Sequence, residues 1–313
     1  MNTTHTAVLG AGVIGASWAS LFLAAGHSVA VYDTAKSCEK AVRDYISSAW
    51  PALERLGLTA NGNQDALTFH QSAVEAVTGA SFIQESVPEQ VDIKHELFQL
   101  IENALEPECV VASSASGLTL SEMQAGWSNP HRFVLGHPFN PPHLIPLVEI
   151  MGNEKTDDSA VTRTEQFYQS IGKITIRVNK ERPGHVANRL QAAVWREALH
   201  LVKEGVASVE DVDKAMWAGP GLRWAAMGPN MLFHLGAGAG GMNEFCQRYT
   251  DSFNTWWDDL GTPYLDENAA QLLVSGVEKE AGAASTDELS KQRDELIVAM
   301  LQVTQDIRES GES

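Results

Sequence analysis

The chain has 313 residues, of which 44% are apolar and 20% are charged, and its net charge is −18. This length and composition predict a folded protein of two domains. The acidic excess argues against nucleic acids and anionic membranes as partners, because both repel negative charge. Three scattered cysteines, Cys38, Cys109 and Cys246, argue against a disulfide framework and against a bound metal, so we expect a cytoplasmic protein.

Residues 7–32 are mostly apolar, but they do not have the pattern of a signal peptide or a membrane span. The preceding segment MNTTHT has no lysine or arginine, which a signal peptide would carry. Four glycines interrupt the run and make it a poor spanning helix. A buried strand, a helix and a second strand explain the segment better.

The turn after the first expected strand has the pattern G-x-G-x-x-G at residues 10–15. Gly10 allows the tight turn, Gly12 lets a pyrophosphate approach the backbone, and Gly15 lets the helix pack closely on the sheet. The unpaired N–H groups at the start of the helix favour negative charge. The residues expected to hold a dinucleotide here are Gly10, Gly12, Val13, Ile14 and Gly15.

Asp33 ends the second expected strand, 18 residues after Gly15. A carboxylate at this distance accepts hydrogen bonds from a ribose 2′-hydroxyl and would repel a 2′-phosphate. The segment therefore predicts NAD as the cofactor and disfavours NADP.

Further strands are expected within residues 80–88, 109–116 and 132–139, with a helical pattern between the first two. Alternating strands and helices are typical of a parallel sheet, whose ligands bind outside the carboxyl ends of the strands. We therefore expect Glu89, Ser116 and His137 to open onto one crevice.

His137 can exchange a proton near neutral pH, and Glu149 follows it by 12 residues in the strand-like run LVEIM. A buried carboxylate is costly unless it is paired, and a hydrogen bond from the imidazole would pair it. The two would then form a base and its orienting group. From the spacing alone a second interpretation stays open, in which His137 is structural and Glu149 faces solvent from an edge strand.

Three motifs in this order, SSASGL (113–118), GHPFNPPHLIPLVEI (136–150) and RPGHVANRL (182–190), resemble the L-3-hydroxyacyl-CoA dehydrogenase family. The resemblance extends over nearly the whole chain. It implies an α/β Rossmann-type, doubly wound and mainly parallel sheet, followed by an all-α C-terminal domain. It also implies an NAD-dependent oxidoreductase.

The resemblance implies a role for each matching residue. His137 is the general base, Glu149 orients it, and the side chains of Ser116 and Asn188 bind the reacting oxygen of the substrate. The positions matched to the cofactor site are Glu89, Lys94, Ser116 and Asn140.

Strand patterning ends after residue 178, and the expected domains are an NAD-binding Rossmann domain (1–181) and an all-α substrate and dimerisation domain (182–313). A helix is expected from Pro183 to just before Gly205. Ser208 and the pair Ser285–Glu288 have the pattern of N-terminal caps of later helices. The glycine-rich run 236–241 is expected to separate two helices. The resemblance implies a homodimer formed through this domain.

The segment expected to meet a CoA phosphate has balanced charges. Its charged residues are Lys36, Lys40, Arg43 and Arg55 against Glu39, Asp44, Glu54 and Asp65. Such a balance does not predict a phosphate clamp. This segment and residues 219–235 resemble instead the branch of the family that contains the L-carnitine dehydrogenases and the λ-crystallin-type L-gulonate 3-dehydrogenases, which act on free 3-hydroxy acids. An L-3-hydroxyacyl-CoA dehydrogenase remains the alternative.

The carboxylate of a free acid needs a cationic partner, for which Arg223 is the candidate; the other interpretation is an ion pair at a domain or subunit contact. A quaternary ammonium group would need an aromatic cage, and five tryptophans lie in the second half: Trp195, Trp217, Trp224, Trp256 and Trp257. The helical spacing of Phe245, Tyr249, Phe253 and Trp256 is more typical of core. A carnitine-like and a gulonate-like substrate both stay open.

One function of another class also stays open, a crystallin-like structural protein with vestigial NAD binding. The joint presence of Ser116, His137, Glu149 and Asn188 argues against it.

Overall fold

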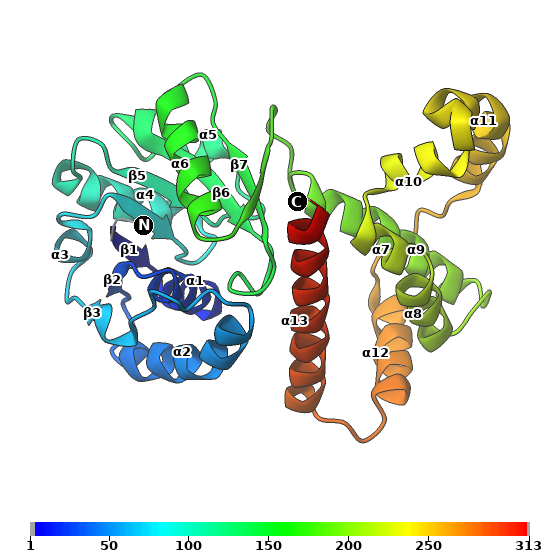
Figure 1. The fold of residues 1–313 in the computed structure, drawn as a ribbon, viewed down its shortest axis with the longest axis horizontal. Coiled ribbons are helices and arrows are strands. Elements are labelled where there is room, and N and C mark those ends of the chain that lie inside the picture. The colour runs from blue at the N-terminus through cyan, green and yellow to red at the C-terminus, as the bar shows by residue number, and fades with distance from the viewer. Residues whose placement is uncertain (1–3, 312–313) are drawn as a thin grey trace. The chain divides into compact units, whose positions relative to one another are not determined.

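The structure is a computed structural model that describes residues 4–311, with side chains through residue 307. The chain forms two compact units (Figure 1). The first comprises Met1–Ala187 and Arg293–Ser313, and the second comprises Asn188–Gln292.

An eight-stranded sheet organises the first unit, in the order β3-β2-β1-β4-β5-β6-β7-β8. Its strands are β1 (His5–Leu9), β2 (Ser28–Tyr32), β3 (Leu67–Phe69), β4 (Phe82–Glu85), β5 (Val110–Ser113), β6 (Phe133–Pro138), β7 (Leu147–Met151) and β8 (Ile174–Arg177). All neighbours are parallel except β6 and β7, which are antiparallel. The predicted mainly parallel sheet is confirmed.

Helices cover both faces of this sheet. The helices are α1 (Val13–Ala24), α2 (Cys38–Arg55), α3 (Ala73–Val77), α4 (Val91–Ile101), α5 (Leu120–Gln124) and α6 (Asp158–Ser170), with short 3-10 turns at Gln64–Ala66, Glu102–Ala104 and Pro130–Arg132. Buried side chains of α1, α2 and α6 form one core with the sheet, and those of α3, α4 and α5 form a second core. The unit is therefore doubly wound, as predicted.

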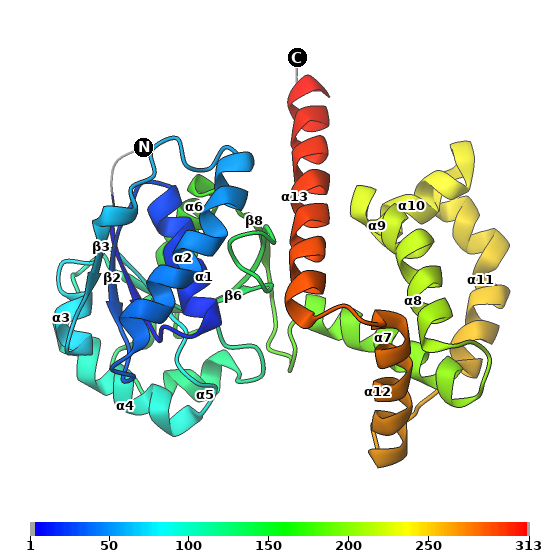
Figure 2. The same cartoon turned by 90° about the horizontal axis from the view of Figure 1, so that it is seen from below.

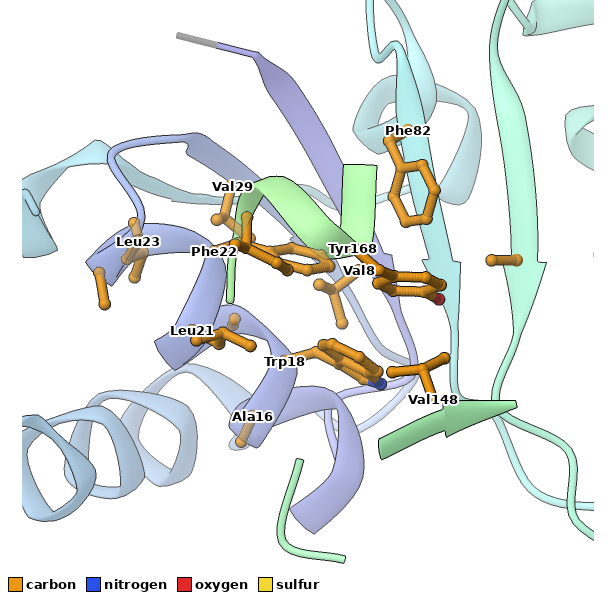
Figure 3. Close-up of a cluster of buried hydrophobic side chains, with 14 of the residues drawn as sticks. Val8, Ala16, Trp18, Leu21, Phe22, Leu23, Val29, Phe82, Val148 and Tyr168 are labelled. Atoms are coloured by element: carbon orange, nitrogen blue, oxygen red, sulfur yellow. The ribbon is translucent and has the colours of Figure 1, made fainter. Parts of the chain in front are cut away.

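Aromatic packing fixes α1 against the sheet. Figure 3 shows Trp18 and Phe22 of α1 beside Tyr168 of α6. The rings of Trp18 and Tyr168 stack with centroids 5.3 Å apart, and the hydroxyl of Tyr168 donates to Gln84 Oε1 at 2.6 Å. Such a pair contributes about 0.5–1.5 kcal/mol beyond its buried area. The helix that carries the glycine turn at its start is thus held rigidly.

The second unit is helical, and its described residues include no strand, which confirms the all-α prediction (Figure 2). Its helices are α7 (Ala187–Lys203), which starts at the last residue of the first unit, α8 (Val209–Ala218), α9 (Pro220–Ala226), α10 (Pro229–Gly236), α11 (Gly241–Asp259) and α12 (Glu267–Ala281). A 3-10 turn at Gly238–Gly240 separates α10 from α11, where the glycine-rich break was expected. The predicted caps are present, because Ser208 accepts from the N–H of Asp211 and Ser285 exchanges bonds with Glu288.

The predicted start of the helix at Pro183 is wrong. The helix α7 begins at Ala187, because Gly184 and His185 have φ values of +76° and +49° and form a turn. Helical φ values are negative, so a helix cannot run through these two residues.

The last helix, α13 (Thr286–Gly311), runs from the second unit into the first. Val298 is buried with Leu56 and Leu144 of the sheet unit. Gln302 Nε2 donates to the carbonyl of Arg55 at 2.8 Å. The C-terminal part of α13 is therefore packed as part of the sheet unit.

Candidate active site

The glycine turn has the space that a dinucleotide requires. Gly10 has φ +90°, and a Cβ there would lie 2.6 Å from the backbone of Ser86. A Cβ at Gly15 would collide with the carbonyl of Gly10, whereas a Cβ at Gly12 would have no atom within 4 Å. The open side of Gly12 lies at the start of α1, where backbone N–H groups favour a phosphate. Gly10 and Gly15 therefore leave no room for a Cβ, and the open side of Gly12 has room for a pyrophosphate.

Asp33 is fixed beside this turn. Its Oδ2 accepts from the N–H of Ala11 at 2.6 Å, and its Oδ1 accepts from the N–H of Ala35 at 2.8 Å. Each carboxylate oxygen has a further lone pair for a ligand hydroxyl.

The backbone register brings His137 and Glu149 together. The two residues face each other across the antiparallel strands β6 and β7. Opposed residues of an antiparallel pair project from the same face of the sheet. Nδ1 of His137 lies 2.7 Å from Oε2 of Glu149, and their side chains are 7% and 0% exposed. The interpretation in which Glu149 faces solvent is therefore wrong.

Glu149 is held as a carboxylate. Its Oε1 accepts from the N–H groups of Val186 and Ala187, both at 2.9 Å. Burial by itself would raise the pKa of Glu149, but the hydrogen bonds from His137 and the two amides outweigh burial and lower it. Because an ionised carboxylate only accepts hydrogen bonds, Nδ1 of His137 must carry the proton. The lone pair of Nε2 is then available to a substrate hydroxyl.

Glu89 anchors the segment that carries Ser116. Its Oε1 accepts from the N–H groups of Ser116 (2.8 Å), Gly117 and Leu118 (3.0 Å), and its Oε2 accepts from Oγ of Ser116 at 2.8 Å. Burial would raise the pKa of Glu89, but these bonds outweigh it and lower the pKa. The structure thus joins the ends of β4 and β5 at the sheet edge.

The other predicted site residues have different surroundings. Lys94 is 1% exposed, and its Nζ lies 2.6 Å from Oε1 of Glu85, a buried carboxylate on β4. Asn140 is exposed in the loop between β6 and β7. Asn188 and Arg223 belong to the second unit, Asn188 as its first residue and Arg223 exposed on α9.

Sequence reasoning missed Lys173, which fixes the loop between His137 and Glu149. Its Nζ donates to the carbonyls of Pro142 and, at 2.8 Å, of Ile145, and it lies 5.2 Å from the ring centre of Trp18. Burial lowers the pKa of Lys173 to about 7. A lysine in the apolar run GKITI was the available signal.

Sequence reasoning also missed His185, although this histidine directly follows Pro183 and Gly184 in the motif at residues 182–190. Its buried ring lies 5.1 Å from the ring of His137, centroid to centroid.

Two family patterns together cover most of the chain. The 3-hydroxyacyl-CoA dehydrogenase NAD-binding domain matches residues 5–182, and the C-terminal domain of the same enzymes matches residues 184–278. The chain belongs to the 3-hydroxyacyl-CoA dehydrogenase family. It is therefore an oxidoreductase that acts on the CH–OH group of a 3-hydroxy acid with a nicotinamide cofactor.

This chain is similar to curated relatives and to a solved structure over nearly its full length. It is 43% identical to an L-carnitine dehydrogenase of Streptomyces coelicolor over 97% of this chain and 95% of the relative. It is 41% identical to an L-carnitine dehydrogenase of Bacillus cereus over 95% of this chain and 91% of the relative. The structure of an NAD-dependent dismutase, 5-formyl-3-hydroxy-2-methylpyridine 4-carboxylic acid 5-dehydrogenase, matches with a TM-score of 0.83 and 27% identity, over 97% of this chain and 99% of that one.

Among the described residues of this dehydrogenase, no helix combines the length and the apolar character that a membrane crossing needs.

Proposed function

We propose that this dehydrogenase uses NAD to oxidise the 3-hydroxyl of a small free L-3-hydroxy acid to the 3-oxo acid, with His137 as the general base. The observation that carries the proposal is the buried contact between His137 and Glu149 at 2.7 Å. This contact supplies a general base, because the carboxylate of Glu149 determines which ring nitrogen of His137 carries the proton.

NAD is the proposed cofactor because of Asp33. Its carboxylate lies against the glycine turn, where a ribose 2′-hydroxyl would donate to it and a 2′-phosphate would be repelled. The turn residues 10–15 would hold the pyrophosphate. When bound, NAD would accept a hydride from the carbinol carbon.

The chain's own residues would handle the proton. Nε2 of His137 takes the hydroxyl proton, and Glu149 stabilises the resulting imidazolium. Ser116 and Asn188 would bind the reacting oxygen and orient it, and Ser116 would donate to it by turning its hydroxyl from Glu89. A general base of this kind contributes about 10²–10⁴-fold to the rate, and correct positioning supplies much of the remainder.

A free acid is favoured over a CoA thioester because the basic side chains of α2 are already paired. Lys40 pairs with Asp44 and Arg43 with Glu39 within the helix, and Arg55 pairs with Glu295 of α13 at 2.6 Å. Cations bound to carboxylates make a poor clamp for the phosphates of CoA.

Within free acids, a carnitine-like substrate has the stronger support. The relatives at 41–43% identity carry the name L-carnitine dehydrogenase. Arg223 would bind the substrate carboxylate, and aromatic faces would bind a quaternary ammonium group. Trp217, Trp256 and Trp257 of the second unit are more than half exposed and offer such faces.

The proposal includes the assembly and the location of the enzyme. Residues 1–181 would bind NAD, and residues 182–313 would bind substrate and form a homodimer. A row of exposed apolar side chains on α13 supports a dimer: Leu289, Leu296, Met300, Val303 and Ile307. Three free cysteines support a cytoplasmic location.

One panel tests the substrate. NAD reduction is measured with L-carnitine, L-gulonate, L-3-hydroxybutyrate and L-3-hydroxybutyryl-CoA at matched concentrations. We expect L-carnitine to have the highest kcat/KM. Turnover of the thioester alone would overturn the free-acid assignment, and no turnover of any compound would favour the crystallin-like alternative.

A further inference from the structure

His185 has a strained backbone conformation. It is the only non-glycine residue with positive φ in the described chain, at +49°, and it is 4% exposed. The left-handed region is uncommon for side chains other than Asn, Asp and His. Strain of this kind persists where the surroundings enforce it and clusters at functional sites.

The hydrogen bonding of His185 is incomplete. Its Nε2 lies 3.3 Å from the carbonyl of Ala115, which can only accept, so Nε2 carries the proton and Nδ1 is an acceptor. Among the described residues Nδ1 is buried and has no hydrogen-bond partner. A phenyl ring would fill the same space without an unsatisfied nitrogen, but it would lose the bond to Ala115 and tolerate the positive φ less well, so both the hydrogen bond and the backbone favour a histidine here.

His185 connects three parts of the proposed site. Its ring packs on that of His137 at a centroid distance of 5.1 Å and an interplanar angle of 54°. Its bond to Ala115 fixes the residue before Ser116. The two residues that follow it, 186 and 187, donate their N–H groups to Glu149.

The ionisable groups that face His185 come from three elements: His137 on β6, Glu149 on β7 and Glu89 between β4 and α4. Burial lowers the pKa of His185, and the charge of a protonated His137 lowers it further, although Ala115 and the two carboxylates oppose this. Burial and a protonated His137 thus both disfavour a positive charge on His185.

We propose that His185 is a positioning residue whose Nε2–H bond to the carbonyl of Ala115 holds the Ser116 segment at a fixed distance from the ring of His137. The His185 ring contacts the His137 ring at a tilt of 54°, so the same side chain touches both parts of the site. The inference rests on the proposed role of His137 as general base.

Three variants test it: His185→Phe, His185→Gln and His185→Asn. Phenylalanine keeps the ring and loses the donor, glutamine places its amide nitrogen near the former Nε2, and asparagine near the former Nδ1. The measured quantities are kcat and KM for L-carnitine, or for the best substrate of the panel, together with NAD affinity and Tm. We expect His185→Phe to lower kcat about 10–100-fold, as sub-ångström misplacement does, with NAD affinity unchanged. The positive φ strains Phe and Gln alike, so these two variants should have equal Tm values.

A comparison of His185→Gln with His185→Asn shows whether the role of His185 depends on the N–H donor at the position of Nε2. His185→Gln should restore most of kcat because it can donate to Ala115, and His185→Asn should not. A wild-type kcat in His185→Phe would overturn the inference. So would a loss of kcat that parallels a loss of Tm in all three variants.

His137→Ala serves as the control for the underlying proposal. If it is inactive and His185→Phe is fully active, only the inference about His185 fails. If His137→Ala keeps the wild-type rate, the base assignment fails, and the role of His185 fails with it.

Discussion

His137 and Glu149 are opposite each other in the register of β6 and β7, and this register explains their spacing of 12 residues in the sequence. Lys173 pins the intervening loop by its bonds to Pro142 and Ile145. The base and its orienting carboxylate are thus fixed by backbone pairing and by one buried lysine.

Glu149→Gln should abolish the base without disturbing NAD binding. The glutamine amide would donate to Nδ1 of His137, which forces the proton onto Nε2 and removes the lone pair that the substrate needs. We expect kcat to fall about 10²–10⁴-fold. Steady-state kinetics and equilibrium dialysis with NAD check this. Glu154→Gln, at an exposed position, is the matched control, and equal rates for the two variants would contradict the prediction.

The contact between His137 and Glu149 predicts that the free energy of unfolding depends on pH. The folded state lowers the pKa of Glu149 below its ordinary value of 4.5, so the folded protein binds fewer protons at Glu149 than the unfolded chain in that range. The stabilisation is complete above the unfolded pKa and is lost as the pH falls through the folded pKa. Urea unfolding of the wild type and Glu149→Gln should show a gap in free energy that shrinks as the pH falls below 5. A gap that persists undiminished to pH 3 would contradict this.

Asp33→Asn should relax cofactor choice. The amide keeps an acceptor for Ala11 but removes the charge that repels a 2′-phosphate. We expect the ratio of kcat/KM for NAD to that for NADP to fall about 10–100-fold, the worth of one charged hydrogen bond. Asp65→Asn, which is exposed, is the control. An unchanged ratio in Asp33→Asn would remove the basis for assigning NAD.

The apolar row on α13 predicts that charge introduced there separates the subunits. Leu296→Glu combined with Met300→Glu puts two carboxylates among side chains that are more than half exposed in one chain. Light scattering should give the mass of one chain, 33.9 kDa, for this variant and twice that for the wild type. Lys291→Glu, at an exposed polar position on another face of the same helix, should stay dimeric. A monomeric wild type would refute the proposed assembly.

Local patterns were sufficient to predict the mainly parallel sheet. The turn at residues 10–15 requires glycine for steric reasons that are local, and parallel pairing follows from alternating strands and helices. The cost of a buried charge indicated that Glu149 pairs with His137, but the spacing alone left a second interpretation open, and the family resemblance was needed to choose between them.

The sequence did not predict features that depend on distant contacts. Lys173 bonds carbonyls about 30 positions earlier, and Glu89 holds backbone that is 27–29 positions later. The start of α7 was placed too early because His185 has a positive φ within a buried turn, which helical periodicity does not indicate. Contacts between residues so far apart in the sequence help to fix the site, and sequence periodicity does not predict them.

The most direct measurement is NADH formation by His137→Ala at saturating NAD and L-carnitine, with NAD binding measured on the same preparation. The account predicts a rate about 10²–10⁴-fold below the wild type and an unchanged affinity for NAD. A wild-type rate in this variant would contradict the central claim that His137 is the general base.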